Sequence, residues 1–503
     1  MKYKSTRTKN SPPLESSEVI LKGIADDGGL FVPETIPKVT PDEIKSLIDK
    51  NYIGRAVPIL KKFLTDFTED ELFESCELAY DWFDVPSKVP LTILIQDEQH
   101  KDSPVGVMEL YHGNTSAFKD MALQLLPQLM TRALKKVGET KEILILVATS
   151  GDTGKAALAG FADVPQTKIM VFYPADGVSK IQKLQMVTQA GKNVNVTAVK
   201  GNFDDCQNGV KKIFADENIR AELEKSNVKL SSANSINWGR LVPQICYYFA
   251  SYAEFVKSGA IKLGANVNIA VPTGNFGNIL AAYYAKRMGL PVKKLICASN
   301  VNHILTDFFK TGIYDRNRDF YKTITPSMDI LISSNLERLL YHETGGDTER
   351  VKNFMQELNS TGKYKIDTPL KKKLDKIFYA DYATEEETLE AIKLVFGTYK
   401  YLIDTHTAVA MSVVEKYRKN TGDMLPVLLA STASPFKFTG AVLSALGEST
   451  EKIDELAQLD RLSLITNKDI PRNLASLATA KVLHENICNK DEMADCVLKF
   501  AAQ

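Results

Sequence analysis

The segment His112–Asp120 places a lysine in a setting that suits covalent chemistry with an aldehyde. Lys119 precedes a run of apolar residues at helical spacing over residues 121–133, and Asp120 is a natural N-cap for the helix that this run predicts. A lysine at the positive end of a helix dipole, beside the apolar ring of Phe118, is expected to have a lowered pKa. Because imine formation requires a neutral amine, Lys119 is the candidate catalytic residue. A solvated surface lysine is the alternative for this residue taken alone.

A glycine loop, G-N-F-G-N, forms a second candidate element. It follows the strand-like run Asn268–Val271, and a helical stretch begins after it at Ile279. Backbone N–H groups of such a loop, together with the N-terminus of the next helix, can hold a phosphate group. The loop matches neither a Walker loop nor the dinucleotide fingerprint, because no G-K-[ST] follows and its spacing is G-x-x-G. A simple tight turn is the alternative. The expected phosphate ligands are Gly274, Asn275, Phe276, Gly277 and Asn278.

The loop Ser150–Gly154 connects the strand-like residues 142–148 to an alanine-rich helical stretch at 155–161. Hydroxyl groups and backbone amides at a helix N-terminus could hold the carboxylate of a substrate. Capping of the following helix by Asp152 or Thr153 is the alternative. The expected carboxylate ligands are Ser150, Gly151 and Thr153.

A third strand-like run, Pro426–Ala430, ends at the hydroxyl residues Ser431 and Thr432. A hydroxyl group can form a hydrogen bond with a neutral ring nitrogen without protonating it. A lysine with a lowered pKa, a phosphate loop, a carboxylate loop and such a hydroxyl are together what pyridoxal phosphate needs when it acts on an amino acid. We therefore predict pyridoxal 5'-phosphate as the cofactor, bound to Lys119 as a Schiff base.

The elements that position these loops alternate between strand and helix, which predicts an open α/β fold. Continuous apolar runs are typical of parallel strands that are covered on both faces, and ligands then bind beyond the carboxyl ends of the strands. We predict a mainly helical N-terminal domain at residues 1–95 and an α/β domain at 96–250 that carries Lys119. A second α/β domain at 251–503 would carry the glycine loop, with a helical insertion at about 325–395.

The composition excludes several functional classes. The chain has 503 residues, of which 44% are hydrophobic and 25% charged, as expected for a globular protein of two or three domains. Lys and Arg together number 62, as do Asp and Glu, so no electrostatic case for binding nucleic acid exists. The six cysteines form no C-x-x-C pair and the six histidines no metal-binding spacing, so we expect no metal site. We find no signal peptide and no bilayer-spanning apolar run, and we expect a cytoplasmic protein.

Several motifs together resemble the threonine synthase family, whose members are fold type II pyridoxal-phosphate enzymes. The lysine segment is similar to the family motif H-G-P-T-x-A-F-K-D. Asn114 stands where the family commonly has proline, and Ser434 where it commonly has histidine. The further matching segments follow in family order: Asp27–Glu34, Ser150–Gly154, Val178–Gln182 with Gln185 and Met186, Asn234–Trp238 with Arg240, Pro243 and Gln244, Gly274–Asn278, His406–Val409 and Ser431–Phe438.

This resemblance implies a fold and a reaction. The implied fold is α/β, with two open, mostly parallel sheets flanked by helices, similar to the tryptophan synthase β subunit, and with helical N-terminal and C-terminal additions. The implied reaction converts O-phospho-L-homoserine and water into L-threonine and phosphate, the last step of threonine biosynthesis, by γ-elimination and β-hydration. Lys119 is then the base at Cα and Cβ, Thr432 pairs with the pyridine nitrogen of the cofactor, and Asp152 lies near its ring hydroxyl.

The phosphate of such a substrate needs an anion site of its own. A planar guanidinium suits this task through bidentate contacts, so Arg240 is the first candidate and Asn237 accompanies it. Lys180 is the second candidate. The alternative is that Arg240 caps a helix or pairs with a surface carboxylate.

Two other functions stay open. Another fold type II lyase, such as a serine or threonine dehydratase, would share Lys119 and the glycine loop but would need no second phosphate site. A non-catalytic relative could bind a phosphorylated ligand. Beyond a small-molecule substrate we expect neither nucleic acid nor membrane as a partner, and we expect a monomer or homodimer. His112, which opens the lysine segment, could stack near the cofactor.

Overall fold

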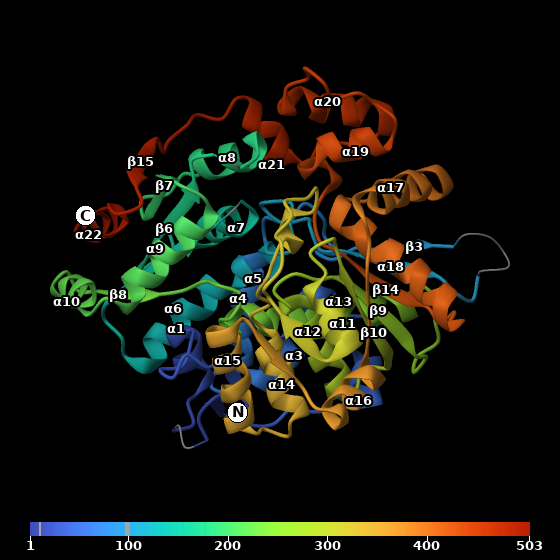
Figure 1. Ribbon diagram of the computed structural model, residues 1–503, viewed down its shortest axis with the longest axis horizontal. Helices are drawn as coiled ribbons and strands as arrows, with labels where there is room; N and C mark the ends of the chain where they lie inside the picture. The colour runs from blue at the N-terminus through green and yellow to red at the C-terminus, as the bar shows by residue number, and fades with distance from the viewer. Residues whose placement is uncertain (10–11, 96–100, 150, 177) are drawn as a thin grey trace.

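The computed structural model describes residues 1–9, 12–95, 101–149, 151–176 and 178–503. The larger of two main sheets has the strand order β13-β10-β9-β14-β4-β3 and lies toward the right of Figure 1. β3 pairs antiparallel with β4, and the other neighbouring strands are parallel. Its strands are β3 (Leu91–Leu94), β4 (Val105–Glu109), β9 (Val267–Pro272), β10 (Val292–Ser299), β13 (Phe378–Tyr382) and β14 (Val427–Ser431).

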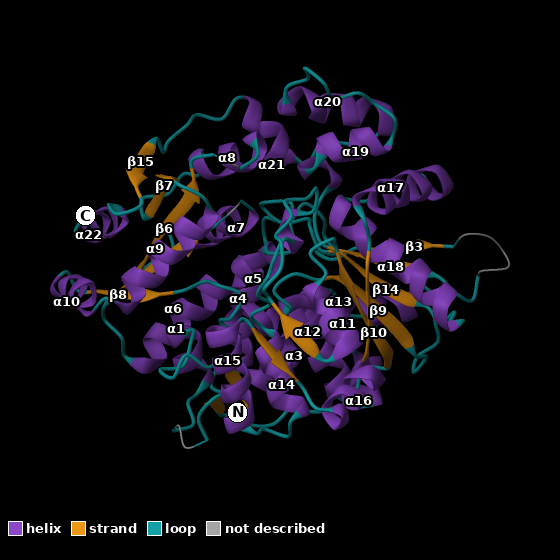
Figure 2. Ribbon diagram, in the orientation of Figure 1, coloured by secondary structure: helices purple, strands orange, loops and turns teal. Residues whose placement is uncertain are grey.

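The smaller main sheet, at the upper left of Figure 2, has the strand order β15-β7-β6-β5-β8. All of its neighbouring strands are parallel. The two sheets confirm the predicted fold class. The strands are β5 (Glu142–Ala148), β6 (Thr167–Pro174), β7 (Val194–Lys200), β8 (Val228–Ser231) and β15 (Asn486–Asn489).

Each main sheet takes strands from more than one of the three predicted chain segments. β4, from the segment 96–250, pairs with β14 in the larger sheet, and β15, near the C-terminus, pairs with β7 in the smaller one. The predicted insertion at about 325–395 also supplies β13. The sheets therefore combine segments that are distant in sequence, and the division into three domains stays a prediction.

Helices cover both sheets and form the two terminal additions. The N-terminal region, blue in Figure 1, also holds a two-stranded sheet of β1 (Tyr3–Ser5) and β2 (Phe31–Pro33), and a second such pair joins β11 (Ile313–Asp315) to β12 (Lys363–Lys365). The helices up to residue 257 are α1 (Ser16–Lys22), α2 (Pro41–Ser46), α3 (Tyr52–Phe63), α4 (Glu69–Tyr80), α5 (Asp120–Leu123), α6 (Leu125–Val137), α7 (Asp152–Phe161), α8 (Lys180–Val187), α9 (Phe203–Ala215), α10 (Glu217–Lys225) and α11 (Trp238–Lys257). Those that follow are α12 (Gly277–Met288), α13 (Ile304–Thr311), α14 (Leu336–Glu343), α15 (Thr348–Thr361), α16 (Thr368–Ile377), α17 (Glu385–Tyr399), α18 (Thr405–Thr421), α19 (Thr439–Ala445), α20 (Glu455–Thr466), α21 (Arg472–Ala475) and α22 (Met493–Ala501), with short 3-10 turns at Pro326–Met328, Pro435–Lys437 and Ser476–Ala478.

Three strands that lead toward the candidate site are buried along their length. Every residue of β4, β9 and β14 is buried, as expected for parallel strands covered on both faces. The loops after β5, β9 and β14 line one shared cavity between the two sheets. The predicted loops therefore meet at the carboxyl ends of their strands, where ligands of open α/β sheets bind.

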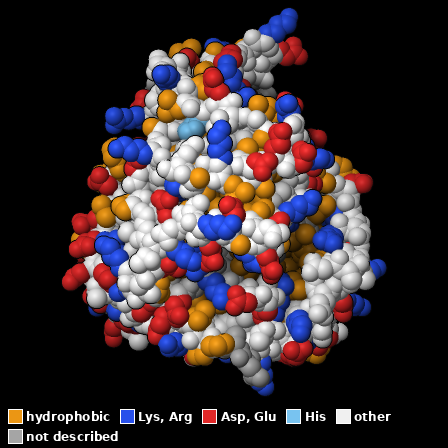
Figure 3. All heavy atoms as spheres, turned by 90° about the vertical axis from the view of Figure 1, so that its left-hand side faces the viewer, with side chains coloured by type: hydrophobic (Ala, Val, Ile, Leu, Met, Phe, Trp, Pro, Cys, Tyr) orange, Lys and Arg blue, Asp and Glu red, His pale blue; other side chains and the backbone are white. Residues whose placement is uncertain are grey.

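The surface on the side of β15 and α22 carries basic and acidic side chains interspersed (Figure 3), in line with equal totals of both charges in the sequence. Across the part of the chain that the structure describes, no helix is both long and apolar enough to cross a membrane. The same residues contain no group of three or more His, Cys, Asp or Glu side chains arranged to hold a metal ion.

Candidate active site

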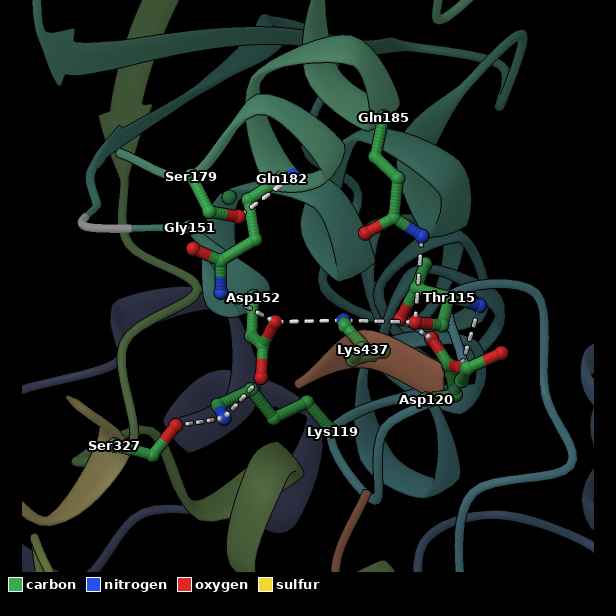
Figure 4. Close-up of polar contacts among 12 residues, drawn as sticks. Thr115, Lys119, Asp120, Gly151, Asp152, Ser179, Gln182, Gln185, Ser327 and Lys437 are labelled. Carbon is green, nitrogen blue, oxygen red and sulfur yellow. Dashed lines mark hydrogen bonds and ion pairs between the residues drawn. The ribbon is translucent and has the colours of Figure 1, made fainter. Parts of the chain in front are cut away.

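Lys119 lies at the start of α5, with its side chain pointing into the cavity between the sheets. Its Nζ atom is 3.1 Å from Oγ of Ser327 and 3.4 Å from Oδ2 of Asp152 (Figure 4). Burial lowers the pKa of Lys119, Asp152 opposes this effect, and the cationic Lys437 and Arg240 lower the pKa further. The amine is therefore neutral more often than that of a surface lysine.

The loop before Lys119 folds back over the start of the helix. Asp120 is the first residue of α5 rather than its N-cap, so that expectation was wrong. Its carboxylate accepts hydrogen bonds from the main-chain N–H and the hydroxyl of Thr115, both at 2.8 Å. A Cβ atom at Gly113 would lie 2.5 Å from Cβ of Asp120, so only glycine permits this close approach.

The lysine segment is joined to the end of β14. The N–H of Phe118 donates to the carbonyl of Thr432 at 2.8 Å, and the N–H of Ser434 donates to the carbonyl of Ser116 at 3.0 Å. Thr432 and Lys119 consequently line the same cavity. The contact of Thr432 with the ring nitrogen of a cofactor stays a prediction.

Asp152 links three parts of the site. Its Oδ1 atom accepts from Nζ of Lys437 at 2.6 Å and from Nε2 of Gln182 at 3.0 Å. Burial alone would raise the pKa of the Asp152 carboxyl, but Lys437 and Lys119 lower it far below its usual range. Asp152 is therefore a permanent anion beside Lys119. Lys437 was not predicted as a site residue, although it belongs to the matching segment Ser431–Phe438.

The loop after β5 is organised by a threonine that was not predicted. Oγ1 of Thr149 accepts hydrogen bonds from the N–H groups of Gly151 and Gly154, each at 3.0 Å. Gly151 has a φ of 149°, and a Cβ atom there would lie 2.5 Å from the side chain of Gln182. Thr153 lines the cavity, whereas Ser150 lies outside the described residues. The carboxylate-binding role of this loop stays a prediction.

The glycine loop connects β9 to α12, and all five of its residues line the cavity between the sheets. Phe276 takes the left-handed conformation, with φ of 64°. A Cβ atom at Gly274 would lie 2.5 Å from the carbonyl oxygen of Ser327, whereas at Gly277 its nearest neighbour, in Asn335, would be 3.6 Å away. The backbone therefore approaches another chain segment at Gly274 and leaves space at Gly277.

Asn278, in the first turn of α12, has a free donor. Its Oδ1 atom accepts hydrogen bonds from the hydroxyls of Tyr247 and Tyr248, which fix the orientation of the amide. Its buried Nδ2 atom has no hydrogen-bond partner among the described residues. A free amide donor at a helix N-terminus suits a phosphate group.

Arg240 brings a buried positive charge into the same cavity from α11. One guanidinium nitrogen donates to the carbonyl of Ala233 at 2.9 Å, and the Nε atom has no hydrogen-bond partner within the described part of the chain. Burial lowers the pKa of Arg240 to about 10. No carboxylate of a described residue pairs with it, so the alternative of a surface ion pair is not observed. A buried guanidinium without an anion favours an anionic ligand.

Three expected residues lie elsewhere. The structure corrects the expectation for Asn237: it is the N-cap of α11, and its amide donates to the carbonyls of Ile20 and Ser232, which uses both of its hydrogens. Lys180 is half exposed and pairs with Asp454 instead of lining the cavity. His112 stacks on Tyr111 and lines a second cavity.

Besides Lys437 and Thr149, two further site residues were missed. Ser327, which contacts Lys119, comes from a region without a recognisable motif. His406 lines the cavity, holds Asp404 through Nδ1 at 2.9 Å and accepts from the N–H of Ser327 through Nε2 at 3.3 Å. The matching segment His406–Val409 was a signal for this histidine.

Comparisons with known proteins identify relatives of this chain. Three family models match the chain in order: "Threonine synthase N terminus" at residues 2–80, "Pyridoxal-phosphate dependent enzyme" at 89–368 and "Threonine synthase, C-terminal" at 407–482. Threonine synthase-like 1 of Homo sapiens is 41% identical over 86% of this chain, which spans 58% of that relative's length. Threonine synthase of Saccharomyces cerevisiae is 36% identical over 93% of this chain and 94% of its own. The crystal structure of PLP-bound threonine synthase from Brucella melitensis superimposes with a TM-score of 0.87 at 34% identity, covering 100% of both chains.

Proposed function

Because the chain belongs to the threonine synthase family of pyridoxal-phosphate-dependent enzymes, we propose that it converts O-phospho-L-homoserine and water into L-threonine and phosphate. The reaction is a γ-elimination followed by β-hydration and ends threonine biosynthesis. The cofactor is pyridoxal phosphate, that of the family. We propose the small-molecule substrate as the partner, and a cytoplasmic monomer or homodimer as the working form.

The residues of the cavity fit this cofactor. The N-terminus of α12 and the free Nδ2 donor of Asn278 would hold its phosphate, with the space beside Gly277 open to it. Thr432 would contact the ring nitrogen, and Asp152 would lie near the ring hydroxyl. When bound, pyridoxal phosphate supplies an electron sink for a carbanion at Cα of the substrate.

Lys119 is the proposed base at Cα and then at Cβ of the substrate. Its lowered pKa increases the fraction of neutral amine that can accept a proton. Ser327 and Asp152 hold the Nζ atom from two directions. The anionic Asp152 stabilises the ammonium that Lys119 becomes when it accepts the proton from Cα.

Arg240 is the residue that favours a phosphorylated substrate over the substrates of a dehydratase. We propose two anion receptors in the cavity: the glycine loop with Asn278, and the guanidinium of Arg240, which pairs with no carboxylate of the described residues. A dehydratase would need only the first receptor, for the phosphate of the cofactor. The second is available for the phosphate of the substrate, which must be bound and stabilised as it leaves. Gly151 and Thr153, with Ser150, are the proposed ligands of the substrate carboxylate.

Product analysis tests the proposal against its two alternatives. The purified protein, loaded with pyridoxal phosphate, is incubated separately with O-phospho-L-homoserine, L-serine and L-threonine. Threonine and phosphate released in equal amounts from the first substrate alone are the expected result. Keto acids formed from serine or threonine would identify a dehydratase instead. Binding of O-phosphohomoserine without turnover would identify a non-catalytic relative.

A further inference from the structure

A second cavity adjoins the lysine segment. Its volume is about 560 Å³, against about 210 Å³ for the active-site cavity, and it is within the size range of small-molecule sites. Two of the chain segments that line this cavity also supply residues of the active site. His112 opens the lysine segment, and Ser434 follows Thr432 by two residues. A ligand in this cavity would therefore touch the same chain segments as the active site without entering it.

The polar side chains in the inner part of the cavity already have hydrogen-bond partners. Glu109 accepts hydrogen bonds at 2.7 Å from the hydroxyls of Thr92 and Tyr401 and contacts Nε2 of His112, also at 2.7 Å. The ring of His112 stacks on Tyr111. Since these inner groups already have partners, the polar side chains that can still bind a ligand lie at the mouth of the cavity.

The mouth carries exposed charges of both signs. Arg472 and Lys468 provide two cations, and Asp84 and Asp469 provide two carboxylates. No hydrogen bond or contact ion pair joins these four side chains to another described residue, although Arg472 is near enough to Asp84 to oppose the rise in pKa that burial causes at this carboxyl. The remaining wall is apolar and contains Val85, Leu402, Phe436 and Ile470. Adjacent opposite charges beside an apolar wall match a zwitterion with an apolar side chain.

The wall that carries Arg472 is tied to the lysine segment by the next residue. Nδ2 of Asn473 donates to the carbonyl of Asn114 at 2.8 Å, and Oδ1 of Asn473 accepts from the hydroxyl of Ser116 at 2.9 Å. A ligand that immobilises Arg472 also immobilises this clamp. Ser434 lines the cavity, so a larger side chain such as histidine at this position would occupy part of it.

We propose that this cavity is a second small-molecule site, which binds a free amino acid with an apolar side chain and, when occupied, stabilises the lysine segment through Asn473. The carboxylate of the ligand would bind Arg472 and Lys468, and its ammonium group Asp84 and Asp469. The site does not depend on the reaction proposed above, because none of these residues lines the active-site cavity.

Calorimetric titration of the full-length, cofactor-loaded protein with L-leucine tests the site. Saturable binding is expected, without a change in the absorption spectrum of the cofactor. 3-Methylbutylamine lacks the carboxylate of leucine, and 4-methylpentanoate lacks its ammonium group. Each should bind at least about tenfold more weakly than leucine, since each loses a charged hydrogen bond. Absence of leucine binding at millimolar concentration, or a spectral change that accompanies all of the binding, would overturn the proposal.

Four variants locate the binding. Arg472→Ala and Asp84→Asn should each weaken leucine binding about tenfold, and Ser434→His should abolish it. Arg220→Ala removes an exposed arginine of α10 that does not line this cavity, so it should leave leucine binding unchanged. Because Arg472 and Asp84 are exposed, these two variants should fold even if Ser434→His does not. Wild-type affinity in both surface variants would place the leucine elsewhere.

Hydrogen exchange tests the coupling. Leucine should slow amide exchange at residues 113–118 in the wild type. Asn473→Ala should still bind leucine but lose this protection, because the clamp on Asn114 and Ser116 is gone. Unchanged exchange in the leucine-bound wild type would refute the coupling.

Discussion

The ammonium group of Lys437 lies 2.6 Å from Oδ1 of Asp152, and both side chains are buried. Asp152 therefore divides its negative charge between Lys437 and Lys119, whose Nζ atom lies farther away, at 3.4 Å. Lys437 thus prevents Asp152 from acting as a full counter-ion to Lys119. This arrangement keeps an anion beside the lysine while its pKa stays lowered.

Lys437→Met should raise the pKa of Lys119. Removal of the nearby cation ends one of the effects that lower this pKa and leaves Asp152 paired with Lys119 alone. The proposed base then loses its proton only at higher pH, so the acidic limb of the pH profile of kcat/KM should move to higher pH. Lys183→Met, at an exposed position of α8, is the control. An unchanged acidic limb in Lys437→Met would mean that Lys437 does not influence the base.

Lys119→Ala should fold but lose turnover. Asp152 keeps its ion pair with Lys437 in this variant, so no buried anion is left alone. Borohydride reduction followed by peptide mapping should attach the cofactor to Lys119 in the wild type and leave this peptide unmodified in the variant. Wild-type activity in Lys119→Ala would contradict the proposed mechanism as a whole.

The two glycines of the phosphate loop should respond differently to alanine. Gly274→Ala places a Cβ atom 2.5 Å from a backbone carbonyl, so it should lower the stability by about 1–3 kcal/mol and also weaken cofactor binding. The added methyl group in Gly277→Ala would lie 3.6 Å from Asn335, its nearest neighbour among the described residues outside the local helix backbone. The variant should therefore keep the melting temperature but weaken cofactor binding by filling the space for the phosphate. Melting curves and cofactor retained on dialysis measure the two effects. Full retention in both variants would show that the loop is only a turn.

Arg240→Ala should separate substrate binding from stability. Because the buried guanidinium pairs with no carboxylate of the described residues, its removal should cost little stability in the free protein. If it binds the substrate phosphate, kcat/KM for O-phosphohomoserine should fall on the order of 10²-fold, with cofactor retention unchanged. Arg240→Lys should recover part of the loss, since it restores the charge without the bidentate geometry. Loss of cofactor retention instead would assign Arg240 to the phosphate of the cofactor, and a normal kcat/KM would exclude both roles.

The sequence by itself determined the elements whose signal is local. The apolar period over residues 121–133 placed the helices after Lys119, and its apolar positions are fully buried. Continuous apolar runs identified β5, β9 and β14, and the glycine spacing identified the loop that ends at Asn278. These features depend on neighbouring residues alone, so periodicity and turn chemistry were sufficient.

Only the tertiary structure decided which distant side chains meet. Ser327, in the 3-10 turn Pro326–Met328, contacts Lys119 across 208 positions. Lys437, in the 3-10 turn that follows β14 of the larger sheet, contacts Asp152, which follows β5 of the smaller sheet. The expectation for Asn237 failed for the same reason: its partner Ile20 is 217 positions away. Hydrogen bonds and ion pairs form between whatever groups folding places within a few ångströms, and a pattern read along one chain does not contain that distance.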